Sequence, residues 1–342
     1  YTGEDTLSLH DALPIYRTSN ITLSYLFTTD PTTTESRNIY DPLPAGIPLT
    51  LNDLHSNSKM RGTEHTFQAD YTTPLSKNQT LNAGAKFIGR RNTSDSKFYN
   101  IINGKEVFDS NNSVNYKNTQ SILASYIEYK LTLGKFSAKA GARYEHTWEN
   151  VEFILGKGDD FKKNYGNLVP SASFTYNIGA AVNVGVNYNM RISRPGISFL
   201  NPYIDRSTPT VLTYGNPNLD VEESHKVNLV FNAFTPKFMI NLTLGEAFAN
   251  NQIEQYSFMD ANGILNTTYG NIVRSRWTNF NTFINYSLTP NTRIFLNGGF
   301  DYGDMRSDKL SQKKHAWQAT AFIGLQQTLP WNVKMSIYTG GM

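Results

Sequence analysis

The chain has 342 residues, no cysteine, and a net charge of +3 from 31 basic and 28 acidic residues. The lack of cysteine excludes disulfides, thiolate metal sites and cysteine nucleophiles. The small net charge, without basic runs interleaved with aromatics, argues against nucleic-acid binding. Only 39% of the residues are hydrophobic, yet 20 Tyr and 20 Phe are present. This balance is typical of segments that are apolar on every second residue only.

The first residues, YTGEDTLSLHDALPIY, differ from everything that follows. They have neither the basic start nor the apolar run of a signal peptide. The stretch TLSLHDALPI is the conceptual translation of a widely used short-read sequencing adapter. We therefore predict that residues 1–15 are a non-native, adapter-derived segment and that the protein itself begins at Tyr16.

Beyond this stretch, apolar and polar residues alternate with a period of two, which indicates strands because successive strand side chains point to opposite faces. We count about thirteen such segments, each close to the roughly ten residues that a tilted membrane strand needs. In the clearest one, Val182–Ser193, one face carries only apolar and aromatic side chains: Val182, Val184, Val186, Tyr188, Met190 and Ile192. The opposite faces of several segments carry charges, among them Glu128, Lys130, Lys139, Arg143 and Arg191. Such a face suits a wet or plugged lumen, and the alternative is a soluble sheet with one solvated face.

Two kinds of connection separate these segments. Short links rich in Gly, Pro and Asn favour tight turns and lie at Pro74–Gln79, Leu133–Lys135, Asn177–Ala181, Thr235–Lys237, Thr289–Thr292 and Leu329–Asn332. Long polar loops are predicted between them, at residues 29–61, 91–116, 149–164, 194–221, 249–274 and 303–313.

This asymmetry separates the candidate folds. Outer-membrane barrels have short periplasmic turns and longer external loops, whereas soluble sandwiches rarely sort their loops in this way. Propellers need a blade repeat, and none is visible. No apolar run is long enough for a membrane helix, but barrel strands need none. We predict an all-β fold, an antiparallel transmembrane β-barrel.

No catalytic or metal-binding pattern is present. The six histidines are scattered without ligand spacing: His10, His55, His65, His146, His225 and His315. The adjacent carboxylates Asp159–Asp160 and Glu222–Glu223 point apart in an extended chain and make poor acid–base pairs. We therefore predict no enzymatic activity, no cofactor and no metal site.

One segment carries an informative motif. It begins RISRPGISFLNPY and closes with YGNPNLDVEESHKVNL, within Arg191–Leu229. The pair resembles a segment in the barrel domain of TonB-dependent outer-membrane receptors, particularly the outer-membrane β-barrel family. The matching residues are Arg194, Pro195, Leu200, Asn201, Pro202, Tyr203, Gly215, Asn216, Pro217, Leu219 and Glu222. Val221 stands where the family usually has proline.

The resemblance implies a barrel of twenty-two strands, a plug domain in its lumen, and import of a scarce solute such as a siderophore, haem or oligosaccharide. About thirteen strands make residues 16–342 a barrel fragment that we expect to be truncated at both ends. The implied location is the cell outer membrane. The implied partners are its lipid, the plug and the TonB complex, with a surface lipoprotein as a further candidate.

Two alternative functions stay open. A passive porin or barrel adhesin would show the same alternation, and a soluble extracellular β-sheet protein that binds glycans is the third class. The external loops would supply ligand contacts, with aromatic candidates at Phe199, Tyr203, Tyr214, Tyr256 and Tyr269. The sequence identifies no single one of them as a ligand-binding residue.

Overall fold

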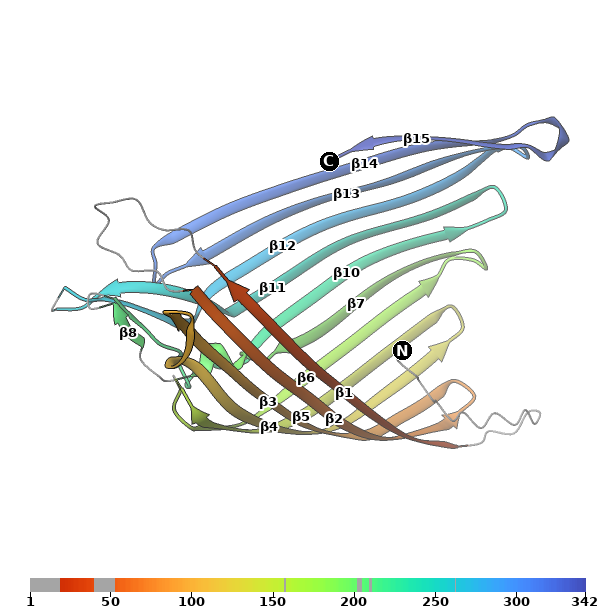
Figure 1. Cartoon of the computed structure of the whole chain (residues 1–342). Coiled ribbons are helices and arrows are strands. Elements are labelled where there is room, and N and C mark those ends of the chain that lie inside the picture. The colour runs from red at the N-terminus through yellow and green to blue at the C-terminus, as the bar shows by residue number, and fades with distance from the viewer. Residues whose placement is uncertain (1–18, 40–52, 157, 202–204, 209–210, 262) are drawn as a thin grey trace.

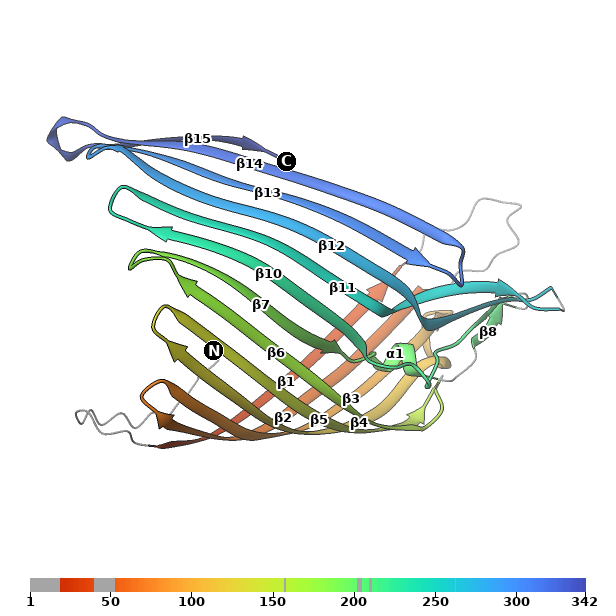
Figure 2. The same ribbon diagram turned by 180° about the vertical axis from the view of Figure 1, so that it is seen from behind.

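The computed structural model describes residues 19–39, 53–156, 158–201, 205–208, 211–261 and 263–342. Residues 1–15, predicted to be adapter-derived, lie outside this part, so that assignment stays a prediction. The described strands form one 15-stranded sheet that curves round on itself (Figures 1 and 2).

All strands except β8 and β9 follow one antiparallel path in chain order. They are β1 (Asn20–Asn38), β2 (Asp53–Ser76), β3 (Gln79–Ile102), β4 (Lys105–Leu133), β5 (Phe136–Leu155), β6 (Phe161–Asn177), β7 (Val182–Ser193), β10 (Glu222–Phe234), β11 (Phe238–Met259), β12 (Leu265–Thr289), β13 (Thr292–Ser307), β14 (Gln312–Thr328) and β15 (Lys334–Gly341). Thirteen strands therefore lie on the path, as predicted.

All six predicted tight turns are confirmed, and they gather at one end of the sheet, on the right in Figure 1. The β4–β5 turn shows their chemistry. Gly134 adopts a φ of 55° there, a left-handed conformation that glycine reaches without steric cost. The last turn, between β14 and β15, contains the short 3-10 helix η1 (Pro330–Asn332).

The predicted loops at residues 91–116 and 249–274 are wrong. β3 and β4 continue through the first as a hairpin that turns at Asn103 and Gly104, and β11 and β12 continue through the second. β4 reaches 29 residues rather than roughly ten. These extensions lie beyond the part of the wall that meets lipid, so no strict apolar alternation marks them as strands. Their paired backbone groups are nevertheless satisfied.

The two faces of the sheet differ as the alternation predicted. Leu123 and Ile127 on the outward face are 44% and 54% exposed. The other face carries Glu128, whose carboxylate lies 3.0 Å from Lys139 Nζ on the next strand. The predicted polar face thus pairs its charges across strands.

The connection between β7 and β10 spans residues 194–221 and lies on the concave side of the sheet. It contains α1 (Ile197–Leu200), β8 (Asp205–Thr208) and β9 (Val211–Thr213). It contacts the same face of both β5 and β12, which are five places apart in the strand order. A short segment can reach both strands only from inside the curve. α1 is too short to cross a membrane, and no described helix is long and apolar enough to do so.

Candidate functional site on the concave face

The motif segment, residues 194–222, is held in the concavity by backbone pairing at its middle. β9 runs parallel to the start of β12, with Val211 opposite Leu265. The amide of Tyr214 then donates to the carbonyl of Thr267 at 3.1 Å. These bonds fix the second half of the segment against the wall on its β12 side.

Arg194 fixes the first half of the segment to β5. Its Nε donates to Thr147 Oγ1 at 3.2 Å, and its Nη2 pairs with Glu145 Oε2. The other oxygen of Glu145 lies 2.8 Å from Arg143 Nε. Glu145 is 8% and Thr147 0% exposed. A carboxylate buried to this extent needs such partners because removing a charge from water is costly.

The motif turn at Gly215 and Asn216 folds back on α1. The Gly215 amide donates to Asn201 O at 2.8 Å, and the Asn216 amide donates to Phe199 O at 2.6 Å. The Asn216 side chain donates to Tyr269 O at 3.1 Å and accepts from the Asn218 amide at 3.0 Å. Asn216 therefore links the turn to β12 and shapes the turn itself.

Two motif leucines supply the apolar anchor. Leu200 is 0% and Leu219 1% exposed, and both pack with Val151 on β5 and Phe161 on β6. Pro217 adds a polar contact on this side, since its carbonyl accepts from Lys163 Nζ at 3.2 Å. The segment is thus packed onto the barrel wall as a small core rather than extended into solvent.

Glu222 closes the motif at an irregularity in β11. The pairing of β11 with β12 shifts register between Gln252 and Ile253, and Glu222 Oε1 accepts from the Ile253 amide at 2.7 Å. Asn251 Nδ2 donates to Val221 O at 2.7 Å. A bulge leaves backbone groups unpaired; Glu222 satisfies the Ile253 amide, and Asn251 joins the bulge to Val221.

A buried polar group lies beneath the segment. Glu149 is 5% exposed, and its Oε1 accepts a hydrogen bond from Asn118 Nδ2 at 3.1 Å; Tyr165 lies near it on β6. Along their strands, Glu149 and Tyr165 lie more than about ten residues from the nearest tight turn, which places them beyond the part of each strand that crosses the bilayer. Burial raises the pKa of Glu149, opposed by hydrogen bonds from Asn118 and Gln120. Burial also raises the pKa of Tyr165 to about 12 and lowers the pKa of Lys163.

The sequence matches the model of the outer membrane protein beta-barrel family over residues 17–340. The chain belongs to this family. Its members are outer-membrane proteins, and the cell outer membrane is accordingly the location of this chain. No curated protein matches the sequence.

Solved structures share the fold. The copper transporter OprC aligns with a TM-score of 0.63 at 10% identity, covering 89% of this chain and 46% of OprC. The ferric-catecholate import receptor Fiu from E. coli K12 aligns with a TM-score of 0.58 at 13% identity, covering 84% of this chain and 45% of Fiu. The ferric citrate transporter FecA aligns with a TM-score of 0.57 at 13% identity, covering 85% of this chain and 48% of FecA. At such identities the likeness shows the fold alone, and the chain spans about half the length of these proteins.

The family motif predicted from the sequence is gathered into one place. The segment brings together Arg194, Pro195, Leu200, Asn201, Gly215, Asn216, Pro217, Leu219 and Glu222. Pro202 and Tyr203 lie outside the described residues. The hydrogen bonds and apolar contacts described above join these members to the wall of the barrel and to the rest of the segment.

The aromatic ligand candidates are less uniform. Phe199 and Tyr269 pack on the apolar anchor, with ring centroids 4.6 Å apart. Tyr256 lies elsewhere, beneath Lys309, whose Nζ is 3.9 Å from the ring centroid. Tyr214 follows β9, and Tyr203 lies outside the described residues. The structure therefore brings Phe199 and Tyr269 together and separates Tyr256 from them.

Sequence reasoning missed the wall residues that receive the segment. Glu145, Thr147 and Glu149 alternate along β5 and all face the concavity. Their spacing could have indicated a common face. Their partners could not have been identified, because Arg194 is 49 positions from Glu145.

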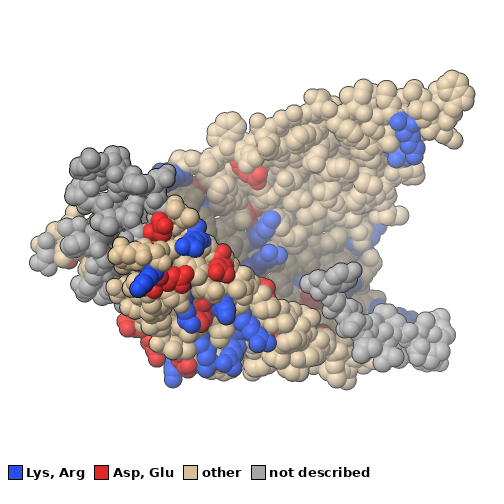
Figure 3. All heavy atoms as spheres, in the orientation of Figure 1, with Lys and Arg blue, Asp and Glu red and all other residues tan. Residues whose placement is uncertain are grey.

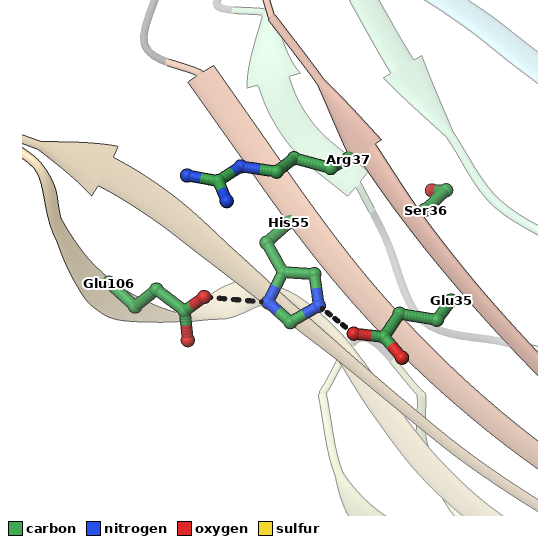
Figure 4. Close-up of a pocket in the computed structure, with 5 residues that line it drawn as sticks. All are labelled: Glu35, Ser36, Arg37, His55 and Glu106. Carbon is green, nitrogen blue, oxygen red and sulfur yellow. Dashed lines mark hydrogen bonds and ion pairs between the residues drawn. The ribbon is translucent and has the colours of Figure 1, made fainter.

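A second cluster lies on the loop-side extension of β1, β2 and β4 (Figure 4). His55 is held between two carboxylates, with Nε2 3.0 Å from Glu35 and Nδ1 2.9 Å from Glu106. The carboxylates lie on opposite edges of the ring, so they do not converge on one point. No group of three or more His, Asp or Glu in the described chain is arranged to hold a metal ion. This cluster joins three strands.

Proposed function

We propose that this chain is part of the barrel of a TonB-dependent receptor that imports a scarce solute across the outer membrane. The observation that carries the proposal is the motif segment. It is folded into the concavity and fixed to β5 and β12, where it narrows the lumen from the loop side. A segment fixed across the interior leaves less room for free diffusion and provides a shaped surface, which a gated importer requires.

The comparisons support the same class. The structural relatives are named as a copper transporter, a ferric citrate transporter and a ferric-catecholate import receptor. The candidate solutes here are a siderophore, haem, an oligosaccharide or a similar molecule. A plug domain, the TonB complex and outer-membrane lipid are the partners that this function requires. We assign the chain no enzymatic step.

Uptake by intact cells tests the proposal. Cells with and without the complete gene are given ferric citrate, a ferric catecholate, haem, copper and labelled oligosaccharides, each with and without a protonophore. We expect gene-dependent accumulation of at least one probe that stops when the inner-membrane proton gradient is removed. Gene-dependent accumulation that continues without the gradient would instead indicate a passive porin.

A further inference from the structure

An aromatic belt runs round the outward face of the sheet. We define it by its exposed or half-exposed rings: Tyr25, His65, Tyr144, His146, Trp148, Tyr188, His225, Tyr302, His315 and Trp317. In four Tyr–His pairs the tyrosine hydroxyl lies within hydrogen-bond distance of the histidine Nδ1, at 2.9, 3.4, 2.9 and 3.0 Å. Amphipathic rings on the lipid-facing side mark the membrane–water interface. The belt therefore indicates the depth of the outer interface.

Immediately beyond the belt, two arginines share an outward-facing pocket. Arg61 and Thr63 on β2 and Arg91 and Thr93 on β3 line it, and its volume is about 390 Å³. The register places Arg61 opposite Thr93 and Thr63 opposite Arg91. Along the same face of β2, Thr63 is the next outward residue after His65 of the belt. The pocket thus lies at headgroup depth rather than in the lumen.

Charged side chains are concentrated on this part of the surface. Figure 3 shows them gathered over the loop-side ends of β1–β4, while the surface nearer the tight turns carries only scattered charges. This division is the one expected between a headgroup layer and a hydrocarbon band.

In the part of the chain that the structure describes, the two guanidinium groups have no acidic partner. Among the described residues, no carboxylate lies within 4.0 Å of Arg61 or Arg91. Other arginines are paired: Arg90, facing inward, with Glu64, and Arg306, facing outward, with Asp304. Two unpaired, exposed cations on adjacent strands repel each other unless an anion lies between them.

We propose that the Arg61–Arg91 pocket binds the phosphate group of an anionic lipid in the outer leaflet. Guanidinium groups bind phosphate through two parallel hydrogen bonds each. The position just beyond the aromatic belt presents both groups to lipid headgroups, and a solute on its way to the lumen does not pass this surface. This inference is independent of the import function.

Lipid binding to the purified protein in nonionic detergent tests the proposal. Native mass spectrometry counts bound lipid A, its dephosphorylated form and phosphatidylcholine. The variant Arg61→Gln/Arg91→Gln is compared with Arg191→Gln/Arg293→Gln, which removes the same charge from exposed positions on the inward face. We expect the first variant to bind lipid A about ten- to a hundredfold more weakly, and the second to bind like the unmodified protein.

Further variants and ligands test whether the pocket recognises the lipid phosphate through its guanidinium groups. Arg61→Lys/Arg91→Lys keeps the charge but loses the planar fork, and we expect it to recover only part of the affinity. Equal binding of dephosphorylated lipid A would overturn the proposal, as would equal loss in the inward-facing control. Displacement of lipid A by inorganic phosphate at matched concentration would show that the pocket recognises free phosphate and not a lipid.

Discussion

Gly215→Ala should release the motif segment from the barrel wall. A Cβ on Gly215 would lie 2.5 Å from Asn201 O, 2.7 Å from Asn201 N and 2.7 Å from Phe199 O. All three are backbone atoms, so no side chain can rotate away. The turn must move, and it then loses the amide bonds from Gly215 to Asn201 O and from Asn216 to Phe199 O.

The expected magnitude follows from these contacts. Overpacking costs about 1–3 kcal/mol and each lost backbone hydrogen bond about 1 kcal/mol. The sum of about 3–5 kcal/mol lowers the ratio of docked to undocked segment by about 150- to 5,000-fold. The pairing of the long strands is untouched, so the barrel wall itself should keep its stability.

Hydrogen exchange measured by mass spectrometry resolves the two parts of the chain. Peptides from the motif segment should lose protection in Gly215→Ala, and peptides from β5 and β11 should not. Gly196→Ala is the matched control, because a Cβ there meets nothing within 4 Å and its φ of −71° suits any residue. Unchanged protection in Gly215→Ala, or equal loss in Gly196→Ala, would refute the packing argument.

Three further changes test the contacts round the segment. Arg194→Gln should weaken docking of the segment by about 2–3 kcal/mol, because buried Glu145 then keeps only Arg143 as a partner. Limited proteolysis of the segment measures this loss. Cleavage of the segment as slow as in the control Arg191→Gln would contradict the prediction. Glu222→Ala removes the acceptor for the Ile253 amide. It should lower the free energy of local opening at the β11 bulge by about 1–3 kcal/mol, measured by hydrogen exchange, with Glu223→Ala as the control. Burial raises the folded-state pKa of Glu149 above its ordinary 4.5, so protonation favours the docked state: docking should weaken as pH rises from 4.5 through the folded-state pKa and change no further above it. Glu149→Gln should remove that dependence and increase protection at neutral pH, and an unaltered pH profile would contradict the assignment.

The sequence predicted the strands that have one face toward lipid and one polar face, because their side chains alternate in polarity. Between the tight turns and the belt one face meets lipid, so the two-residue alternation of Val182–Ser193 is visible and its strand is found. The turns were equally visible because glycine, proline and asparagine mark them. Beyond the belt neither face of a strand meets lipid, and the Ser- and Asn-rich stretch after Arg91 therefore lacks the alternation that distinguishes strand from loop.

The sequence predicted which residues belong to the candidate site, but not where in the fold they lie. Arg194, Gly215 and Glu222 were found by their resemblance to a family motif. That they fold inward depends on Glu145 and Thr147, whose polarity on an inward face is equally compatible with a wet lumen. Pairings that span 49 positions arise from the curvature of the whole sheet, which no local pattern encodes.

The direction of the two edge strands has a consequence for closure. β1 and β15 stand at the two ends of the order, and among the described residues they do not pair with each other. Thirteen strands in antiparallel succession make the first and the last run the same way, and Figure 1 draws both arrowheads toward the loop-side end. Joining the two edges directly would create a parallel seam, whereas bacterial barrels of this type close with an even number of antiparallel strands. Only an odd number of strands between these edges gives each of them an antiparallel neighbour.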